Sequence, residues 1–185
     1  VFVNQPFLKE LEQMVIADLG VHLTDAARYF FGEAEYLYAQ VSRVTPGVKG
    51  EDVATILFTF ENGCRCTVEL SVATRQEIPH FPQTLVHIEG TRAVITAHEN
   101  YKISVVTDAG VEIIDASPRD FKWVNSDYAV VHSSIHDCNK SILDAINGDA
   151  VGETTGEDNL ETLRLAYAAY ASAKDNKVVH RKAFN

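Results

Sequence analysis

The stretch DVATILFTFENGCRCTVELSV, from Asp52 to Val72, has the pattern of two strands joined by a tight turn. Its first half is rich in Val, Thr, Ile and Phe, and Asn62-Gly63 can supply the positive φ angles of a hairpin. Apolar and polar residues alternate from Cys64 to Val72, as they do in a strand that buries one face. The stretch therefore predicts an antiparallel hairpin with one core face and one polar face.

Further strand-like segments lie on both sides of this hairpin. They are rich in β-branched and aromatic residues, and Asp108-Ala109-Gly110 closes a second turn. The connections between them are short, so most pairs are expected to be antiparallel. Together the segments predict a sheet of about six to eight strands. The expected strands are residues 36–44, 52–60, 64–73, 83–89, 92–96, 102–107 and 111–114, with a short one at 178–179.

Helical patterns flank this strand-rich middle of the chain. Gly32 and Gly148 end two of them, and Ser134 with Asp137 is a candidate capping box near the start of the second. This order of parts predicts an α+β fold, in which helices pack on one face of a largely antiparallel, partly mixed, open sheet. The expected helices are residues 8–31, interrupted near 18–20, then a segment after 131 that ends at 148, and 157–176.

Composition narrows the class of protein. The 185 residues are 46% hydrophobic and 23% charged, which suits a globular chain with a proper core. A net charge of −10 without a long basic cluster argues against a nucleic-acid partner. No run of about 18 apolar residues is present and the start lacks a signal-peptide pattern, so we expect a cytoplasmic protein without a membrane partner. Three cysteines are too sparse for a disulfide framework.

A polar arc on the first helical segment is the main candidate for chemistry. At about 100° per residue, four side chains fall on one helix face beside an apolar stripe. A carboxylate one turn from an imidazole can orient the ring, and histidine is suited to proton transfer near neutral pH. Gly20 allows a close approach between the two, and His80, in a loop between strands, could overhang the site. The four residues of the arc are Asp18, His22, Asp25 and Tyr29.

Two other interpretations of this arc stay open. Asp18 could be only an N-cap for a helix that starts at Leu19, with His22 and Asp25 as ordinary satisfied side chains. The arc could also hold a metal ion, although the chain has no HExxH or CxxC pattern. The sequence contains no G-x-G-x-x-G, P-loop or G-x-S-x-G motif, so no cofactor module is recognisable in it.

The order of these features resembles the C-terminal domain of the glucose-fructose oxidoreductase and inositol dehydrogenase family, often written Gfo/Idh/MocA. The resemblance implies a two-domain enzyme, in which an N-terminal Rossmann domain binds NAD or NADP. It also implies that the C-terminal α+β domain contacts the substrate and forms a homo-oligomer through its open sheet face. The matching stretches, DLGVHLTDAARYFFGE, GEDVATILFTFENGC, IEGTRAVI and TGEDNLETLRLAYAAYASAKDNKVV, span nearly the whole chain.

The resemblance assigns roles to residues of the arc. Asp18 and His22 fall on the aspartate and histidine that assist proton transfer at the substrate hydroxyl or carbonyl. Independently of the resemblance, Asp25 and Tyr29 share the helix face and are candidate substrate contacts, with a structural role as an equal alternative for Asp25. His80 is a further candidate contact, and no metal is expected. The family's lysine, in a Lys-Pro motif, belongs to the N-terminal domain, and this sequence has no Lys-Pro pair.

Residues 1–185 are therefore expected to form a single substrate-binding and oligomerisation domain of an NAD(P)-dependent oxidoreductase. Its substrate would be a sugar, sugar derivative or cyclitol. The chain begins at Val1, so we expect the Rossmann domain to lie outside it and the chain alone to be inactive. The main alternative is a non-catalytic binding or assembly module of the same fold, and a metal-dependent hydrolase or isomerase is the third. The polar residues of the hairpin, Arg65, Thr67, Glu69 and Ser71, are candidates for partner contact.

Overall fold

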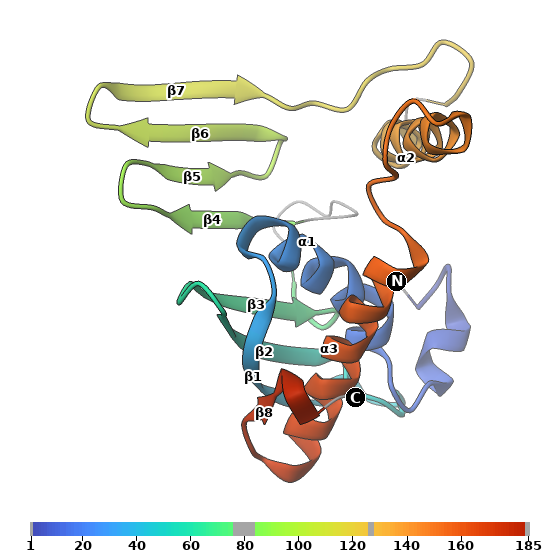
Figure 1. Ribbon diagram of the computed structural model, residues 1–185. Coiled ribbons are helices and arrows are strands. Elements are labelled where there is room, and N and C mark those ends of the chain that lie inside the picture. Colours follow the sequence, from blue (N-terminus) through green and yellow to red (C-terminus); the bar gives the residue numbers. More distant parts are fainter. Residues whose placement is uncertain (1, 76–83, 126–127, 184–185) are drawn as a thin grey trace. The chain divides into compact units, whose positions relative to one another are not determined.

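The computed structural model describes residues 2–75, 84–125 and 128–183, and these residues have the predicted α+β fold (Figure 1). Every pairing between the described strands is antiparallel. The strands are β1 (Ala34–Ser42), β2 (Val53–Phe60), β3 (Arg65–Ser71), β4 (Val86–Glu89), β5 (Val94–Ala97), β6 (Lys102–Thr107), β7 (Gly110–Asp115) and β8 (Val179–His180). The α-helices are α1 (Val21–Phe31), α2 (Ala129–Asn147) and α3 (Gly156–Asp175), and the shorter helical segments are η1 (Pro6–Glu10), η2 (Ile16–Gly20) and η4 (Arg181–Ala183).

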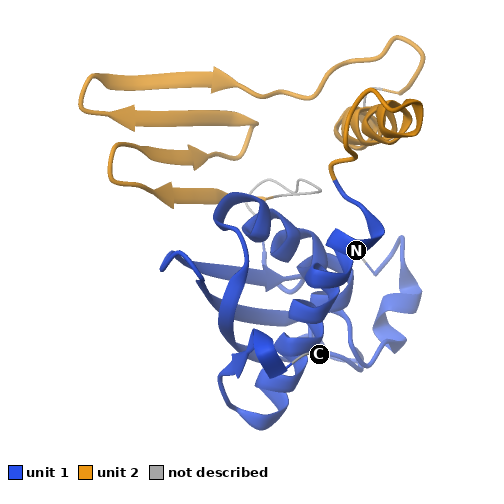
Figure 2. Ribbon diagram, in the orientation of Figure 1, with its two compact units in different colours: residues 1–75, 154–185 blue, residues 76–153 orange. Residues whose placement is uncertain are grey.

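The strands divide between two sheets of four, with the orders β3-β2-β1-β8 and β4-β5-β6-β7. The chain correspondingly forms two compact units, residues 1–75 with 154–185 and residues 76–153 (Figure 2). Strand propensity indicates which segments are extended but does not show which of them share a sheet. The sequence pattern therefore predicts the number and direction of the strands but not their division into two sheets.

The first unit contains the main core. In this unit α1, α3 and η2 pack on one face of the sheet β3-β2-β1-β8, as predicted. Side chains alternate along β3: Val68 and Leu70 are buried, whereas Thr67 and Glu69 are exposed. On α3, alanines and a leucine face the sheet. The small alanine side chains let the helix pack closely against the strands. The buried residues of α3 include Leu165, Ala166, Ala168 and Ala169.

The β2–β3 connection differs in detail from the predicted two-residue turn. Of the Asn62-Gly63 pair only Gly63 has a positive φ, 83°. The Phe60 amide donates to the Cys64 carbonyl at 2.9 Å, so the loop is longer than two residues. Cys64 consequently lies outside β3 and is exposed, which corrects its expected place on the core face.

Two helix starts also differ from their predictions. The Ser134–Asp137 capping box is wrong, because α2 begins earlier, after Tyr128, and both residues lie within it. The Ser134 hydroxyl instead donates to the Val131 carbonyl. By contrast α3 has a side-chain cap, since Thr155 Oγ1 accepts a hydrogen bond from the Asp158 amide.

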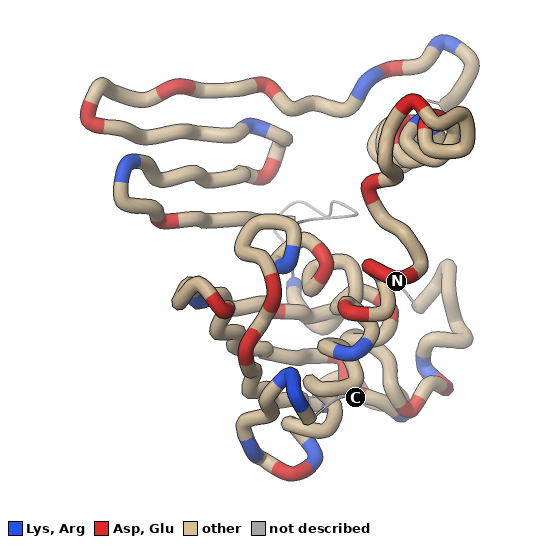
Figure 3. Tube along the Cα trace, in the orientation of Figure 1, with Lys and Arg blue, Asp and Glu red and all other residues tan. Residues whose placement is uncertain are grey.

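Acidic and basic residues are interspersed along the chain (Figure 3). Among the described residues, no helix is long and apolar enough to cross a membrane.

Candidate functional site

The segment that carries the predicted arc is helical but not uniform. Residues Ile16–Gly20 form a π-helical turn that continues directly into α1. A π turn has i→i+5 hydrogen bonds and is wider than an α turn, so the spacing of about 100° per residue does not hold through it. Such turns occur frequently at functional sites.

Asp18 and His22 lie on either side of the junction between η2 and α1. The Asp18 side chain is half-buried, and His22 is exposed. The structure records no hydrogen bond or ion pair between these two described side chains. A bound molecule can reach the His22 imidazole, and joint action of the two residues on a substrate stays a prediction.

The N-cap role for Asp18 is wrong. Its backbone amide donates to the Met14 carbonyl at 2.9 Å, so Asp18 already lies inside the first helical turn. An N-cap residue must precede that turn, since its side chain accepts from amides further along the helix. The Asp18 carboxylate is therefore not used to start the helix.

Two residues outside the predicted arc complete the helix start instead. Glu51 Oε1 accepts hydrogen bonds from the amides of Met14 and Ile16, at 3.0 and 3.1 Å. The Tyr170 hydroxyl accepts one from Ala17 at 3.0 Å. Glu51 precedes β2 and Tyr170 lies on α3, so no local sequence pattern could have linked them to this helix.

Gly20 permits a close approach, but the neighbour is a core side chain rather than the backbone or ligand that was expected between Asp18 and His22. A Cβ atom at Gly20 would lie 2.9 Å from Cδ1 of Leu70 and 3.3 Å from Cγ2 of Ile16. The missing side chain therefore lets the helical segment pack directly against β3.

Asp25 is held by the neighbouring helix. The Thr162 hydroxyl donates to Asp25 Oδ1 at 2.7 Å, and Nη1 of Arg28 lies 3.8 Å from the same oxygen. These contacts give Asp25 a structural role between α1 and α3. Its contact with a substrate stays a prediction.

The buried Arg28 is the centre of a polar network whose carboxylates are partly exposed. Its guanidinium donates to Glu33 Oε1 at 2.6 Å, to Asp158 Oδ1 at 3.0 Å and to Thr162 Oγ1 at 2.8 Å. Burial alone would lower the pKa of Arg28, but the hydrogen bonds and charges of Glu33 and Asp158 raise it above its usual range. The cation therefore stays charged and joins α1, the start of β1 and α3.

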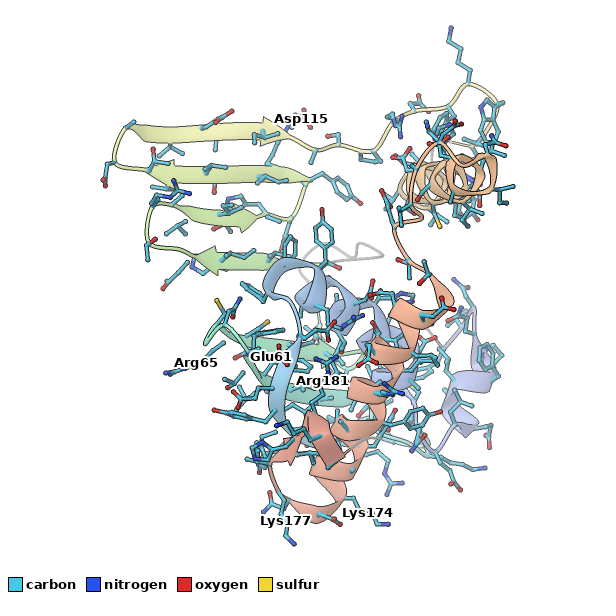
Figure 4. All side chains as sticks on the ribbon, viewed as in Figure 1. Glu61, Arg65, Asp115, Lys174, Lys177 and Arg181 are labelled. Carbon is cyan, nitrogen blue, oxygen red and sulfur yellow. The ribbon has the colours of Figure 1, made fainter. Side chains whose placement is uncertain are left out.

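A second arginine extends this network towards the C-terminal residues. Arg181 of η4 lies 3.3 Å from Glu61, 3.0 Å from Glu161 and 3.5 Å from Glu33, measured between charged atoms (Figure 4). The Arg181 side chain is 34% exposed and that of Arg28 is 7% exposed, so each ion pair of Arg181 is expected to contribute less to stability.

The remaining two candidates for substrate contact are Tyr29 and His80. Tyr29 is 85% exposed and makes an edge contact with Phe30, with 5.5 Å between the ring centroids. Its ring is therefore accessible to a ligand or a partner, and its substrate contact stays a prediction. His80 lies outside the described residues.

Two helix starts of the first unit do not offer a free site for the phosphate of a dinucleotide. The positive helix start that could accept a phosphate in the first unit is filled by Glu51 and Tyr170. The first turn of α3 carries Glu157 and Asp158, whose charges would repel one. Within residues 2–75, 84–125 and 128–183, no three His, Cys, Asp or Glu side chains are grouped so as to hold a metal ion.

A family model described as the GFO/IDH/MocA C-terminal domain matches residues 4–96. The chain belongs to this family. It is 38% identical over 179 residues to a D-apiose dehydrogenase from Rhizobium rhizogenes, covering 97% of this chain and 52% of that protein. It is 35% identical to a D-apiose dehydrogenase from Paraburkholderia graminis, covering 98% of this chain and 48% of that protein. The chain thus spans about half the length of these curated relatives.

Solved structures support the same fold. An oxidoreductase from Agrobacterium radiobacter, crystallised with NAD⁺, L-tartaric acid and magnesium, has a TM-score of 0.95 and 37% identity. That match covers all of this chain and 54% of the other. An oxidoreductase from Thermotoga maritima, with a TM-score of 0.70 and 21% identity, shares the fold over 87% of this chain and 45% of its own.

Proposed function

We propose that this chain is the substrate-binding and oligomerisation domain of an NAD(P)-dependent oxidoreductase that acts on a sugar, sugar derivative or cyclitol. The observation that carries the proposal is the 38% identity to a D-apiose dehydrogenase over 97% of the chain. The proposal also accounts for an exposed histidine and a half-buried aspartate beside a π turn. A branched or linear pentose is the first substrate class to test.

In this proposal His22 exchanges a proton with the substrate hydroxyl or carbonyl. Histidine is a common general acid and base in enzymes, and the His22 side chain is exposed. Asp18 supplies a negative charge nearby, and Asp25, Tyr29 and His80 are the proposed substrate contacts. The nicotinamide, when bound, accepts or donates the hydride.

The cofactor is proposed to bind mainly to an N-terminal Rossmann domain outside this chain. The sequence contains no dinucleotide-binding loop. In the first unit Glu51 occupies the helix start that could otherwise bind a phosphate, which also supports cofactor binding outside this chain. This chain alone is then expected to be inactive, because the hydride acceptor would lack a binding site.

The open face of the sheet β3-β2-β1-β8 is proposed to form a homo-oligomer. Leu57 is 47% exposed there, and its register partners on the two neighbouring strands are Tyr38 and Thr67. The exposed face also carries Arg65 and Glu69. Tyrosine and arginine are enriched at protein interfaces, so Tyr38 and Arg65 on this face support the proposal.

The test is an assay of the whole protein that contains this chain. D-apiose, other pentoses, inositol and L-tartrate are offered with NAD⁺ or NADP⁺, and formation of the reduced nicotinamide is followed by absorbance. Turnover of a sugar or cyclitol supports the proposal. Binding of these compounds without turnover, in a protein that assembles normally, would favour the non-catalytic assembly module of the same fold.

A further inference from the structure

We propose that Glu51 and Tyr170 are positioning residues for His22, acting through the start of the helical segment that carries it. This inference rests on the proposed function of His22. It concerns a carboxylate and a phenol that hold one end of that segment from two other parts of the first unit.

The amides at the start of this segment are all engaged from outside the helix. The first four amides of a helix have no partner within it. Here Glu51 Oε1 accepts from Met14 and Ile16, the Glu51 carbonyl accepts from Val15 at 3.2 Å, and the Tyr170 hydroxyl accepts from Ala17. The first hydrogen bond within the helix follows directly, from Asp18.

The carboxylate and the phenol also bind each other. The Tyr170 hydroxyl donates to Glu51 Oε1 at 2.7 Å. Burial raises the pKa of Tyr170, and the hydrogen bond and charge of Glu51 raise it further, so the hydroxyl keeps its proton and stays a donor. One hydroxyl therefore donates to the carboxylate and accepts from the helix, which fixes both partners.

The backbone around Glu51 is built for this close approach. Glu51 is 7% exposed. A Cβ atom at Gly50 would lie 2.6 Å from the Leu11 carbonyl oxygen and 2.9 Å from that of Glu12. The Lys49 amide also donates to the Lys9 carbonyl at 2.9 Å. Only a residue without a side chain at position 50 lets the two segments lie this close.

The chain from this cap to His22 is short. The capped amides include the first two residues of the π turn Ile16–Gly20, and α1 begins at Val21, so a shift of the helix start is transmitted to Asp18 and His22. Catalytic groups must be held close to a productive geometry, and a misplacement of about 1 Å can lower a rate by about 10²-fold. The cap is therefore expected to act on turnover rather than on cofactor binding.

The decisive variant is Tyr170→Phe in the whole protein, which removes one hydroxyl and keeps the ring. Its matched control is Tyr167→Phe, on the same helix but 62% exposed. We expect Tyr170→Phe to lower kcat for the sugar about 10- to 100-fold with little change in KM for the cofactor. We also expect faster hydrogen exchange at the amides of residues 14–18, and neither effect in the control.

A double-mutant cycle separates positioning from loss of stability. If Tyr170 acts through His22, then Tyr170→Phe lowers kcat when His22 is present but not when His22 is replaced by alanine. A variant that merely unfolds more readily would lower activity by the same factor in both backgrounds. Glu51→Gln keeps an oxygen acceptor and should retain most of the turnover that Glu51→Ala loses.

Three results would overturn the inference. One is unchanged amide exchange at residues 14–18 in Tyr170→Phe. Another is a faster exchange without a fall in kcat, and the third is an equal fall in both backgrounds. A wild-type protein without any turnover would instead contradict the proposed function. The catalytic half of the inference would fail with it, whereas amide exchange would still report whether the cap exists.

Discussion

At the scale of single residues, Gly20 shows how a missing side chain sets the distance between a helix and a sheet. A Cβ atom added at Gly20 would lie 2.9 Å from Cδ1 of Leu70, and both residues are buried. A side chain added here has to displace a core leucine, which close-packed interiors resist.

We predict that Gly20→Ala lowers the free energy of unfolding by about 1 kcal/mol, because overpacking outweighs the better helix propensity of alanine. Gly156→Ala is the matched control, since nothing lies within 4 Å of a Cβ atom there. Urea denaturation of the two variants measures the difference. Equal stability of Gly20→Ala and the wild type would show that Leu70 moves aside at no cost.

Asp52 makes stability depend on pH. It is fully buried, and its two carboxylate oxygens accept hydrogen bonds from the amides of Val44 and Thr45, each at 2.7 Å. Burial by itself would raise the pKa of this carboxyl, but the hydrogen bonds from Thr45 and Val44 outweigh burial and lower it. The folded pKa therefore lies below the unfolded value of about 3.9.

We predict that Asp52 stabilises the fold at neutral pH and that this contribution disappears as the pH falls through the folded pKa. The unfolded chain then binds the proton more readily than the folded chain does. Asp52→Asn should cost about 1–3 kcal/mol at pH 7, and the difference from the wild type should shrink below about pH 4. Denaturant titrations over this range are the measurement, and a difference independent of pH would contradict the assignment.

The sequence indicates some residues of the candidate site and gives no signal for others. Asp18, His22 and Gly20 share one short helical segment, where the spacing of residues is informative. Glu51 and Tyr170 act on the same segment over separations of 35 and 153 residues in their contacts with Ile16 and Ala17. Only tertiary structure brings such partners together, so no periodicity can reveal them.

At the scale of elements, α1 is held at both ends. Tyr170 of α3 contacts the segment before α1, and Thr162 and Asp158 of the same helix bind Asp25 and Arg28 near its end. One helix thus fixes both ends of the segment that carries His22. The Gly156-Glu157-Asp158 start of α3 places Asp158 beside Arg28.

We predict that Arg28→Met lowers the free energy of unfolding by about 2–3 kcal/mol, because it leaves Asp158 and Glu33 without their cation. Lys140→Met is the control: Lys140 forms an exposed pair with Asp144 within α2, and its loss should cost below about 0.5 kcal/mol. Thermal unfolding of both variants tests the contrast. A similar small effect for Arg28→Met would show that the network contributes little.

Elements were predicted best where the local signal is complete. The strand at residues 102–107 has the predicted bounds, and α2 and α3 end close to Gly148 and Asn176 as expected. The π turn was anticipated only as an interruption near residues 18–20. Its start is capped by Glu51 and Tyr170, which are distant in the sequence. The start of α2 has no side-chain cap. Neither boundary could therefore be predicted from the neighbouring residues.

At the scale of the whole molecule, family membership follows from the order of parts along the chain. The strand number and the antiparallel direction were predictable, whereas the division into two four-stranded sheets was not. The chain spans about half the length of its D-apiose dehydrogenase relatives. The proposed chemistry of His22 is therefore a property of the whole protein and has to be tested there.

The most direct test is the turnover number of the whole protein with its best sugar substrate, compared between the wild type and His22→Ala. His87→Ala is the control, because His87 is also exposed but lies on β4 and contacts Thr96. We predict that His22→Ala lowers kcat by about 10² or more, the usual size of a general acid-base contribution, while His87→Ala leaves it unchanged. A near-normal kcat for His22→Ala in a folded, cofactor-binding protein would contradict the assignment of proton transfer to His22.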